Sequence, residues 1–204
     1  MNKIMNSIGQ NARKAILNKI DTRTKNKILK RYALLLDKEK NSIISANQKD
    51  IKFAKKKGLK NNLIDRLTID HKKLVGIKKS IEKTVKIKDP VDYILEKWRR
   101  PNGLTISRVS VPIGVLGIIY ESRPNVTSDV ASLCFKSGNA VILKGGSEAI
   151  NTNKILANLF RKSLKENKVD QNFIQFINSK DRKIVDYMLS KMKDYIDVII
   201  PRGG

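Results

Sequence analysis

The sequence contains few of the features that mark several common classes of protein. Its 204 residues include a single cysteine, Cys134, so no disulfide can form within the chain. The first ten residues, MNKIMNSIGQ, lack the apolar run of a secretory signal peptide, and no segment approaches the length of a membrane span. We therefore expect a soluble, cytoplasmic protein with no membrane partner.

Residues that bind metals or stack on nucleic-acid bases are also scarce. His71 is the only histidine, and it follows the expected helix cap Asp70, so we expect no metal site. Aromatic residues make up 5% of the chain, and the basic residues are spread along many helices rather than gathered on one recognition helix. This pattern argues against a specific nucleic-acid partner. The sequence shows no internal repeat and no low-complexity segment.

Acidic residues are in short supply. Lysine and arginine number 43 against 19 aspartates and glutamates, which gives a net charge of +24. Two interpretations are open: a solvated, lysine-rich surface, or a basic nucleic-acid or polyanion-binding protein on a reused α/β fold. The hydrophobic fraction of 40% and the charged fraction of 30% are those of a globular chain, and its length is enough to bury one substantial core.

The N-terminal third has the periodicity of helices. A first apolar stripe and a second helix, capped by Thr22 or Thr24, are followed by helices at about 39–57, 62–67 and 71–85. The two stripes consist of Ile8, Ala12, Ala15, Ile16 and Leu17, and of Ile28, Leu29, Tyr32, Leu35 and Leu36. The helical run breaks at Asp89-Pro90, which we predict to be a boundary.

A β-hairpin is predicted after this boundary. The strand-like segments 94–100 and 104–109 flank Pro101-Asn102-Gly103, in which Gly103 occupies the position that needs a positive φ. A two-stranded ribbon is not stable alone, so it must pack either on its own domain or on another subunit.

The segment 109–150 predicts a βαβ unit. A buried strand at Val115–Tyr120, a turn at 121–125, a helix at Thr127–Ser137 and a second buried strand at Ala140–Leu143 follow one another. A right-handed crossover makes the two strands parallel. The turns after both strands then lie at the edge of the sheet where helix N-termini offer free N–H groups to an anion.

The alternation of strands and helices continues to the end of the chain. We expect a helix from Ser147, a strand at 173–177, a helix at about 184–192, a strand at 197–200 and a turn at 201–204. The predicted apolar sides of the two helices are Ile150, Ile155, Leu156, Leu159, Phe160 and Leu164, and Ile184, Val185, Met188, Leu189 and Met192. Four strands alternating with three helices predict an open, Rossmann-like parallel sheet, although no G-x-G-x-x-G follows its first strand.

Several long phrases carry a resemblance to a known family. RPNGL, RVSVPIGVLGIIYESRPNVT, LCFKSGNAVILKGGSEAI and DVIIPRGG closely resemble the gamma-glutamyl phosphate reductases, also called glutamate-5-semialdehyde dehydrogenases, of the aldehyde dehydrogenase superfamily. The resemblance covers essentially the whole chain. Members of the family are roughly twice as long, so the chain resembles their N-terminal half, and the segment with the family's catalytic cysteine is absent.

The resemblance implies a fold and an activity. The fold is α/β: a helical region at 1–89 that belongs to the cofactor-binding domain, an oligomerisation ribbon at 90–112, and incomplete Rossmann-like NADP-binding units at 113–204, as in a truncated aldehyde dehydrogenase. The activity is the NADPH-dependent reduction of L-glutamyl 5-phosphate to L-glutamate 5-semialdehyde in proline biosynthesis. The implied partners are that substrate and, through the ribbon, further copies of the chain.

The turn after the second strand is the candidate cofactor site. Lys144, Gly145, Gly146, Ser147 and Glu148 could form an ordinary glycine-rich turn, or a loop whose backbone approaches a phosphate. By resemblance the cofactor is NADP, Lys144 holds its adenosine ribose and 2′-phosphate, and Ser147 and Glu148 line the same pocket. The resemblance also places one further segment along the cofactor phosphates: Pro201, Arg202, Gly203 and Gly204.

Three residues are candidates for the chemistry itself. Asn125 is either a turn residue or, by resemblance, the donor that stabilises the oxyanion. Arg123 either binds a substrate phosphate or carboxylate, or pairs with Glu121. Cys134 lies on the apolar stripe of a helix, where burial raises the pKa of a thiol, so we expect a core residue and not a nucleophile. The 204-residue chain alone is therefore expected to be inactive.

Overall fold

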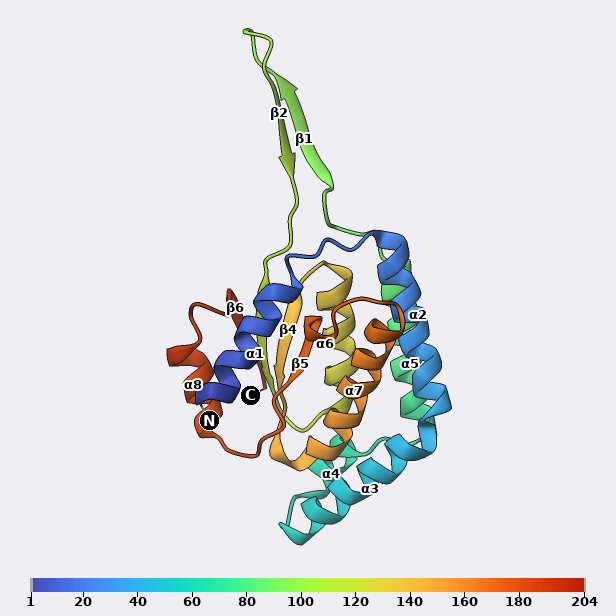
Figure 1. Ribbon diagram of the computed structural model, residues 1–204. Coiled ribbons are helices and arrows are strands. Elements are labelled where there is room, and N and C mark those ends of the chain that lie inside the picture. Colours follow the sequence, from blue (N-terminus) through green and yellow to red (C-terminus); the bar gives the residue numbers. More distant parts are fainter. Residues whose placement is uncertain (1, 204) are drawn as a thin grey trace.

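A four-stranded parallel sheet forms the centre of the protein. The computed structural model describes residues 2–203 (Figure 1). The strands lie in the order β5-β4-β3-β6. The strand that comes first in the chain, β3, therefore lies between β4 and β6. Their bounds are β3 (Val115–Tyr120), β4 (Ala140–Lys144), β5 (Ile174–Phe176) and β6 (Val198–Arg202). This is the order of a Rossmann-like half-sheet, and the predicted parallel topology is confirmed.

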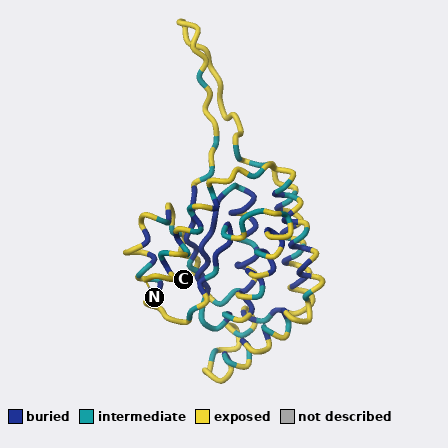
Figure 2. Tube along the Cα trace, in the orientation of Figure 1, coloured by how far each residue is buried: buried dark blue, intermediate teal, exposed yellow. Residues whose placement is uncertain are grey.

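The two inner strands are buried because helices cover both faces of the sheet. Every residue of β4 is buried, and every residue of β3 is buried except the half-exposed Ile119 (Figure 2). The two strands pair in parallel, with Val115 opposite Ala140. On one face lie α6 (Pro124–Lys136) and α7 (Ile150–Glu166); on the other lie α1 (Asn2–Ala15) and α8 (Lys183–Lys191) (Figure 1). Strands shielded in this way read as continuous apolar runs, which is why the sequence predicted them.

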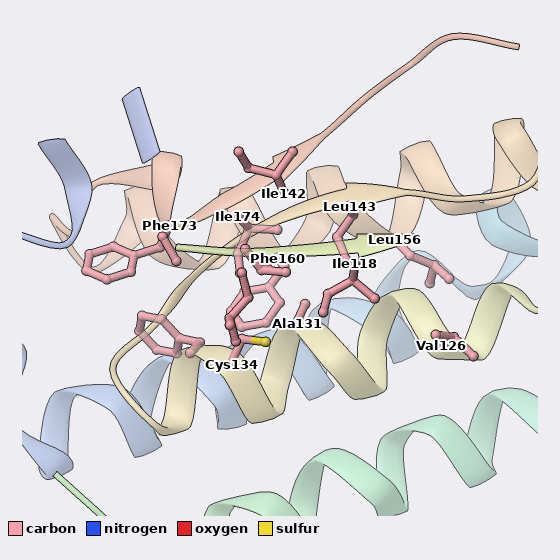
Figure 3. Close-up of a cluster of buried hydrophobic side chains, with 14 of the residues drawn as sticks. Ile118, Val126, Ala131, Cys134, Ile142, Leu143, Leu156, Phe160, Phe173 and Ile174 are labelled. Atoms are coloured by element: carbon pink, nitrogen blue, oxygen red, sulfur yellow. The ribbon is translucent and has the colours of Figure 1, made fainter. Parts of the chain in front are cut away.

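The remaining helices extend the first of these layers. α2 (Thr22–Lys38) packs against α6 and α7, and α5 (His71–Lys86) packs against α2 and α6. α3 (Lys40–Lys56) packs on α7, and α4 (Asn61–Leu67) packs on α3. Aromatic contacts tie the layers into one core. Tyr32 stacks on Phe160 with ring centroids 4.5 Å apart, and Phe135 meets both Phe160 and Phe173 edge-on at 5.6 Å. Figure 3 shows Phe160 and Phe173 within this cluster of buried side chains.

The predicted caps and apolar stripes need two kinds of correction. The cap of α2 is Asp21, whose carboxylate accepts a hydrogen bond from Thr24 N at 2.9 Å, and not Thr22 or Thr24. The cap of α5 is Asp70, as predicted, accepting from Lys73 N at 2.7 Å. Leu17 lies beyond the end of α1 and is exposed, because α1 turns the face with Met5, Gly9, Ala12 and Ala15 inward. Leu189 of α8 is exposed as well.

The hairpin is confirmed, and it stands away from the body of the protein. β1 (Ile94–Arg99) and β2 (Thr105–Val109) pair antiparallel, and Gly103 turns the chain with φ of 86°. All residues of both strands are exposed except the half-buried Ile106 (Figures 1 and 2). The interpretation that the ribbon packs on its own domain is therefore wrong.

Several predicted boundaries shift. α6 begins at Pro124 and not at Thr127, because proline is favoured in the first turn of a helix, so Asn125 is helical. A 3₁₀ turn, η1 (Ser147–Ala149), precedes α7, and another, η2 (Gln171–Phe173), precedes β5. Pro201 and Arg202 belong to β6, where they pair with Ile119 and Tyr120 of β3. Gly204 lies outside the described residues. No helix within residues 2–203 is long and apolar enough to cross a membrane.

Candidate functional site

Two loops converge at the carboxyl edge of the sheet. The ends of β3 and β4, residues 119–123 and 144–148, line a single cavity of about 660 Å³, which also receives side chains from α4 and from the start of α8. Its volume is in the usual range for ligand-binding pockets. Basic side chains outnumber acidic ones around it: Arg66, Arg123, Lys144, Lys180 and Arg182 against Glu121, Glu148 and Asp186.

Lys144 lines this cavity. As the last residue of β4 it is buried, with 5% of its surface exposed, and its Nζ donates to the carbonyl oxygen of Gly145 at 3.0 Å. Burial lowers the pKa of the Lys144 ammonium, and the carboxylates of Glu148 and Asp181 act in the opposite direction. An anionic ligand would add the counter-charge that this ammonium lacks.

Glu148 is held in place by two serines. Its carboxylate accepts from Ser147 Oγ at 2.7 Å and from Ser122 Oγ at 2.9 Å, and Lys57 lies 3.8 Å away. Burial raises the pKa of the Glu148 carboxyl, but these hydrogen bonds and the charge of Lys57 outweigh burial and bring it below the ordinary value. Glu148 is therefore an ionised, oriented acceptor that links the two loops.

The two glycines are required by the protein's own packing. A Cβ on Gly145 would lie 2.3 Å from Nδ2 of Asn153 and 3.0 Å from the Tyr120 ring. A Cβ on Gly146 would lie 2.6 Å from Oγ of Ser122. The sequence predicted a glycine requirement here, but the immediate reason is close packing: Gly145 lies against Asn153 of α7, and Gly146 lies against Ser122 in the loop after β3.

The N-terminus of α7 is not free to hold an anion. Asp50 of α3 accepts hydrogen bonds from the backbone N–H groups of Asn151 at 3.2 Å and Thr152 at 2.8 Å, and from both side chains at 2.8 and 2.6 Å. A carboxylate in this position satisfies the N–H groups and the partial positive charge of the helix. The expectation that this helix end would bind a phosphate is therefore wrong.

Asn125 lies beside a second cavity, of about 500 Å³, between α5 and the start of α6. Its Nδ2 donates to Asp129 Oδ2 at 3.1 Å. Arg123 lines this cavity and the larger one, so it lies between Asn125 and Lys144. Among the described side chains, Arg123 and Glu121 form no ion pair with each other.

A third cavity, of about 340 Å³, lies at the end of β6. Arg202 and Gly203 line it together with Arg123, Glu121 and Arg66. Arg66, at the end of α4, lines all three cavities. Arg66 could not be singled out from the sequence, since one arginine among 43 basic residues carries no signal of its own.

The chain is similar in sequence and in fold to proteins of one family. No family model matches the chain. The gamma-glutamyl phosphate reductase of Clostridium tetani is 46% identical over 206 residues, which cover 100% of this chain and 48% of that protein. That of Thermotoga maritima is 42% identical over 189 residues, 93% of this chain and 45% of the relative. The chain belongs to the gamma-glutamyl phosphate reductase family. It spans about half the length of the curated relatives it matches.

Solved structures agree with the sequence matches. The crystal structure of the Thermotoga maritima gamma-glutamyl phosphate reductase superposes with a TM-score of 0.94 at 40% identity, covering 97% of this chain and 48% of that one. The Saccharomyces cerevisiae enzyme superposes with a TM-score of 0.88 at 33% identity, covering 97% and 51%. A probable aldehyde dehydrogenase from Listeria monocytogenes, 12% identical with a TM-score of 0.72, shares the fold over 99% of this chain and 42% of its own. Nothing in these matches favours the polyanion-binding hypothesis.

The one thiol of this chain is a core residue. Cys134 is 6% exposed and packs beside Ala131 and Phe160 (Figure 3). Burial raises the pKa of its thiol to about 12, so almost no thiolate exists near neutral pH. The prediction that Cys134 is not a nucleophile fits this environment. Within residues 2–203 no cluster of histidine, cysteine and acidic side chains is of a kind that could hold a metal ion.

Proposed function

We propose that this chain forms the cofactor-binding part of a reductase that converts L-glutamyl 5-phosphate to L-glutamate 5-semialdehyde with NADPH, releasing phosphate, in proline biosynthesis. The observation that carries the proposal is the cavity shared by the loops after β3 and β4, which the buried Lys144 lines. The family of the chain supports the same reaction.

The residues of this cavity fit a phosphorylated dinucleotide. The positive charge of the Lys144 ammonium is only partly balanced by the carboxylates of Glu148 and Asp181. Lys57 lies near Glu148, and Lys180 lines the cavity. Glu148, ionised and fixed by Ser147 and Ser122, is suited to accept a hydrogen bond from a ribose hydroxyl. When bound, NADPH supplies the hydride, and the residues of this chain bind and orient the dinucleotide. We assign the cofactor to Lys144, Gly145, Gly146, Ser147, Glu148, Pro201, Arg202, Gly203 and Gly204.

Arg123 and Asn125 are proposed to act on the substrate. The guanidinium of Arg123 has no carboxylate partner among the described residues and can bind a phosphate or carboxylate through two parallel hydrogen bonds. Asn125 would exchange its bond to Asp129 for one to the developing oxyanion. Removing such a donor typically costs about 3–4 kcal/mol of transition-state stabilisation.

The ribbon is proposed to join copies of the chain. A two-stranded ribbon that projects into solvent with large apolar side chains needs a partner surface. Its exposed apolar residues are Tyr93, Ile94, Leu95, Trp98, Leu104, Val109 and Val111. We retain the division into a helical region (1–89), this ribbon (90–112) and the Rossmann-like units (113–204) as part of the proposal.

Cofactor titrations test the proposal. We expect the chain to bind NADPH in preference to free phosphate, and Lys144→Met to weaken NADPH binding at least about tenfold. Lys30→Met, a change of the same charge on the exposed back of α2, serves as the control. RNA is titrated in parallel at low and high salt, since polyanion binding falls steeply with salt. RNA binding without any preference for NADPH would contradict the proposal, as would equal NADPH binding by the two lysine variants.

A further inference from the structure

Three arginines from distant parts of the chain line the smallest of the three cavities. Arg66 comes from α4, Arg123 from the end of β3 and Arg202 from the end of β6. In the part of the chain that the structure describes, none of the three forms an ion pair, whereas Arg13 and Arg31 find Asp197 and Glu166 at 2.7 and 2.6 Å. The cavity therefore collects positive charge that the protein does not neutralise with ion pairs.

Arg66 is held at this position by buried contacts on its C-terminal side. Its neighbour Leu67 is fully buried and packs with Ala54 and Ala149. The buried Asn47 donates from Nδ2 to the carbonyl oxygen of Leu67 at 2.9 Å and accepts at Oδ1 from Ile69 N at 2.7 Å. These contacts attach the end of α4 to α3 and to the 3₁₀ turn η1 that precedes α7.

Lys73 of α5 secures the same turn. Its Nζ donates to the carbonyl oxygens of Asp65 and of Thr68, the latter at 2.8 Å. A cation in this position complements the carbonyl groups at the end of a helix. The backbone on both sides of Arg66 is thus fixed, and its side chain extends from a defined point on the rim of all three cavities.

The other two arginines are also placed by regular structure. Arg123 directly precedes Pro124, the first residue of α6, and Arg202 pairs with Tyr120 in the sheet. One acidic residue, the exposed Glu121, lines the same cavity. Three guanidinium groups against one carboxylate leave a net positive site, and guanidinium forks match the oxygens of a phosphate.

We propose that Arg66, together with Arg123 and Arg202, forms a binding site for a phosphate dianion, with Arg66 as the contribution of the helical region. This inference rests on the proposed function, in which phosphate groups occur in two places. One is the acyl phosphate of the substrate, whose phosphate is released during the reaction; the other is the dinucleotide. The chemistry that the arginines recognise is the same in both.

The test compares three variants of the 204-residue chain by calorimetric titration at one ionic strength. Arg66→Gln removes the charge, and Arg66→Lys keeps the charge without the fork. Arg23→Gln removes another exposed arginine, on α2, that also has no ion pair among the described residues. The ligands are inorganic phosphate, acetyl phosphate, adenosine 2′,5′-bisphosphate and NADPH. Matching far-UV circular dichroism and melting temperatures verify that the variants fold alike.

We expect Arg66→Gln to weaken inorganic phosphate binding at least about tenfold, Arg66→Lys to weaken it less, and Arg23→Gln to change it by less than about twofold. A loss confined to phosphate and acetyl phosphate assigns the site to the acyl phosphate. A loss that extends to the bisphosphate and NADPH assigns it to the dinucleotide. Equal effects of Arg66→Gln and Arg23→Gln on every ligand would overturn the inference, because general attraction to a basic protein would then explain the binding.

The outcomes also separate this inference from the proposed function. If NADPH binding depends on Lys144 but no ligand responds to Arg66→Gln, the phosphate site is refuted and the proposed function stands. If NADPH does not bind at all while phosphate binding depends on Arg66, the phosphate site is supported and the proposed function is refuted.

Discussion

Replacing Asp89 with alanine should destabilise the protein by about 3–5 kcal/mol, the typical cost of removing one partner of a buried ion pair. Asp89 and Lys25 pair at 2.9 Å with side chains only 8% and 3% exposed. Asp89 also accepts from Thr22 Oγ1 at 2.8 Å and from Val91 N at 3.1 Å. The residue at which the helical run breaks thus attaches α2 to the base of the ribbon.

A second buried amine increases the expected effect. Lys136 is 2% exposed. Its Nζ donates to two neutral oxygens, Asn26 Oδ1 at 2.5 Å and the carbonyl oxygen of Val85 at 3.2 Å. Burial lowers the pKa of Lys136, Asp89 counteracts this, and Lys25 adds to it. Without Asp89, two buried ammonium groups would lack a nearby carboxylate. A loss of this size is a large fraction of the total stability of an ordinary domain, about 5–15 kcal/mol.

Urea unfolding followed by far-UV circular dichroism near neutral pH measures the effect as a lower midpoint with an unchanged slope. Asp37→Ala is the matched control, because Asp37 pairs with Lys78 at the surface, and such pairs contribute about 0–1 kcal/mol. The double variant Lys25→Met/Asp89→Ala should recover part of the loss, since it removes one of the unpaired charges. A cost below about 1 kcal/mol for Asp89→Ala, or no difference from Asp37→Ala, would refute the reasoning.

The Asp89–Lys25 pair should also make the stability of the protein depend on pH. Burial raises the pKa of the Asp89 carboxyl, but hydrogen bonds from Lys25, Val91 and Thr22 outweigh burial and hold it below 3.8. The stabilising contribution of the ionised Asp89 is therefore complete above the unfolded-state pKa and is lost as the pH falls through the lower folded-state value. The difference in unfolding free energy between the native protein and Asp89→Ala should shrink in that acidic range.

Two further predictions concern single side chains. Burial lowers the pKa of Lys144, so Lys144→Met should raise the melting temperature near neutral pH. Calorimetry should show that this gain shrinks as the pH rises toward 10.5. A gain that grows with pH would contradict a lowered pKa for Lys144. Burial raises the pKa of Cys134 to about 12, so iodoacetamide should label the thiol in urea but not in the native protein at mildly alkaline pH; labelling at the rate of a free thiol would show that the side chain is accessible.

The central sheet could be predicted from the sequence because its strands are short apolar runs rich in β-branched residues. Val115–Tyr120 and Ala140–Lys144 are buried on both faces, and this leaves a pattern that a single sequence displays. The hairpin was equally clear, since Gly103 must adopt a positive φ. Local chemistry determines both features.

Features that depend on distant contacts could not be predicted. The start of α7 is set by Asp50, which lies about a hundred residues earlier and accepts the hydrogen bonds of Asn151 and Thr152. Arg66 and Asn125 line cavities because of the way α4, α5 and α6 pack together. The identity of neither residue indicates that packing. The need for Gly145 and Gly146 was visible in the sequence, but its cause, the contact with Asn153 and Ser122, appears only in the fold.

The exposed ribbon gives the protein an unusual optical property. Trp98, its only tryptophan, lies on β1 with 40% of its surface exposed, remote from the packed core. Indole emission should therefore report on the ribbon and remain almost unchanged when the α/β body melts. A shift of that emission to shorter wavelength as the protein concentration rises would record docking of the ribbon, free of any contribution from the rest of the molecule.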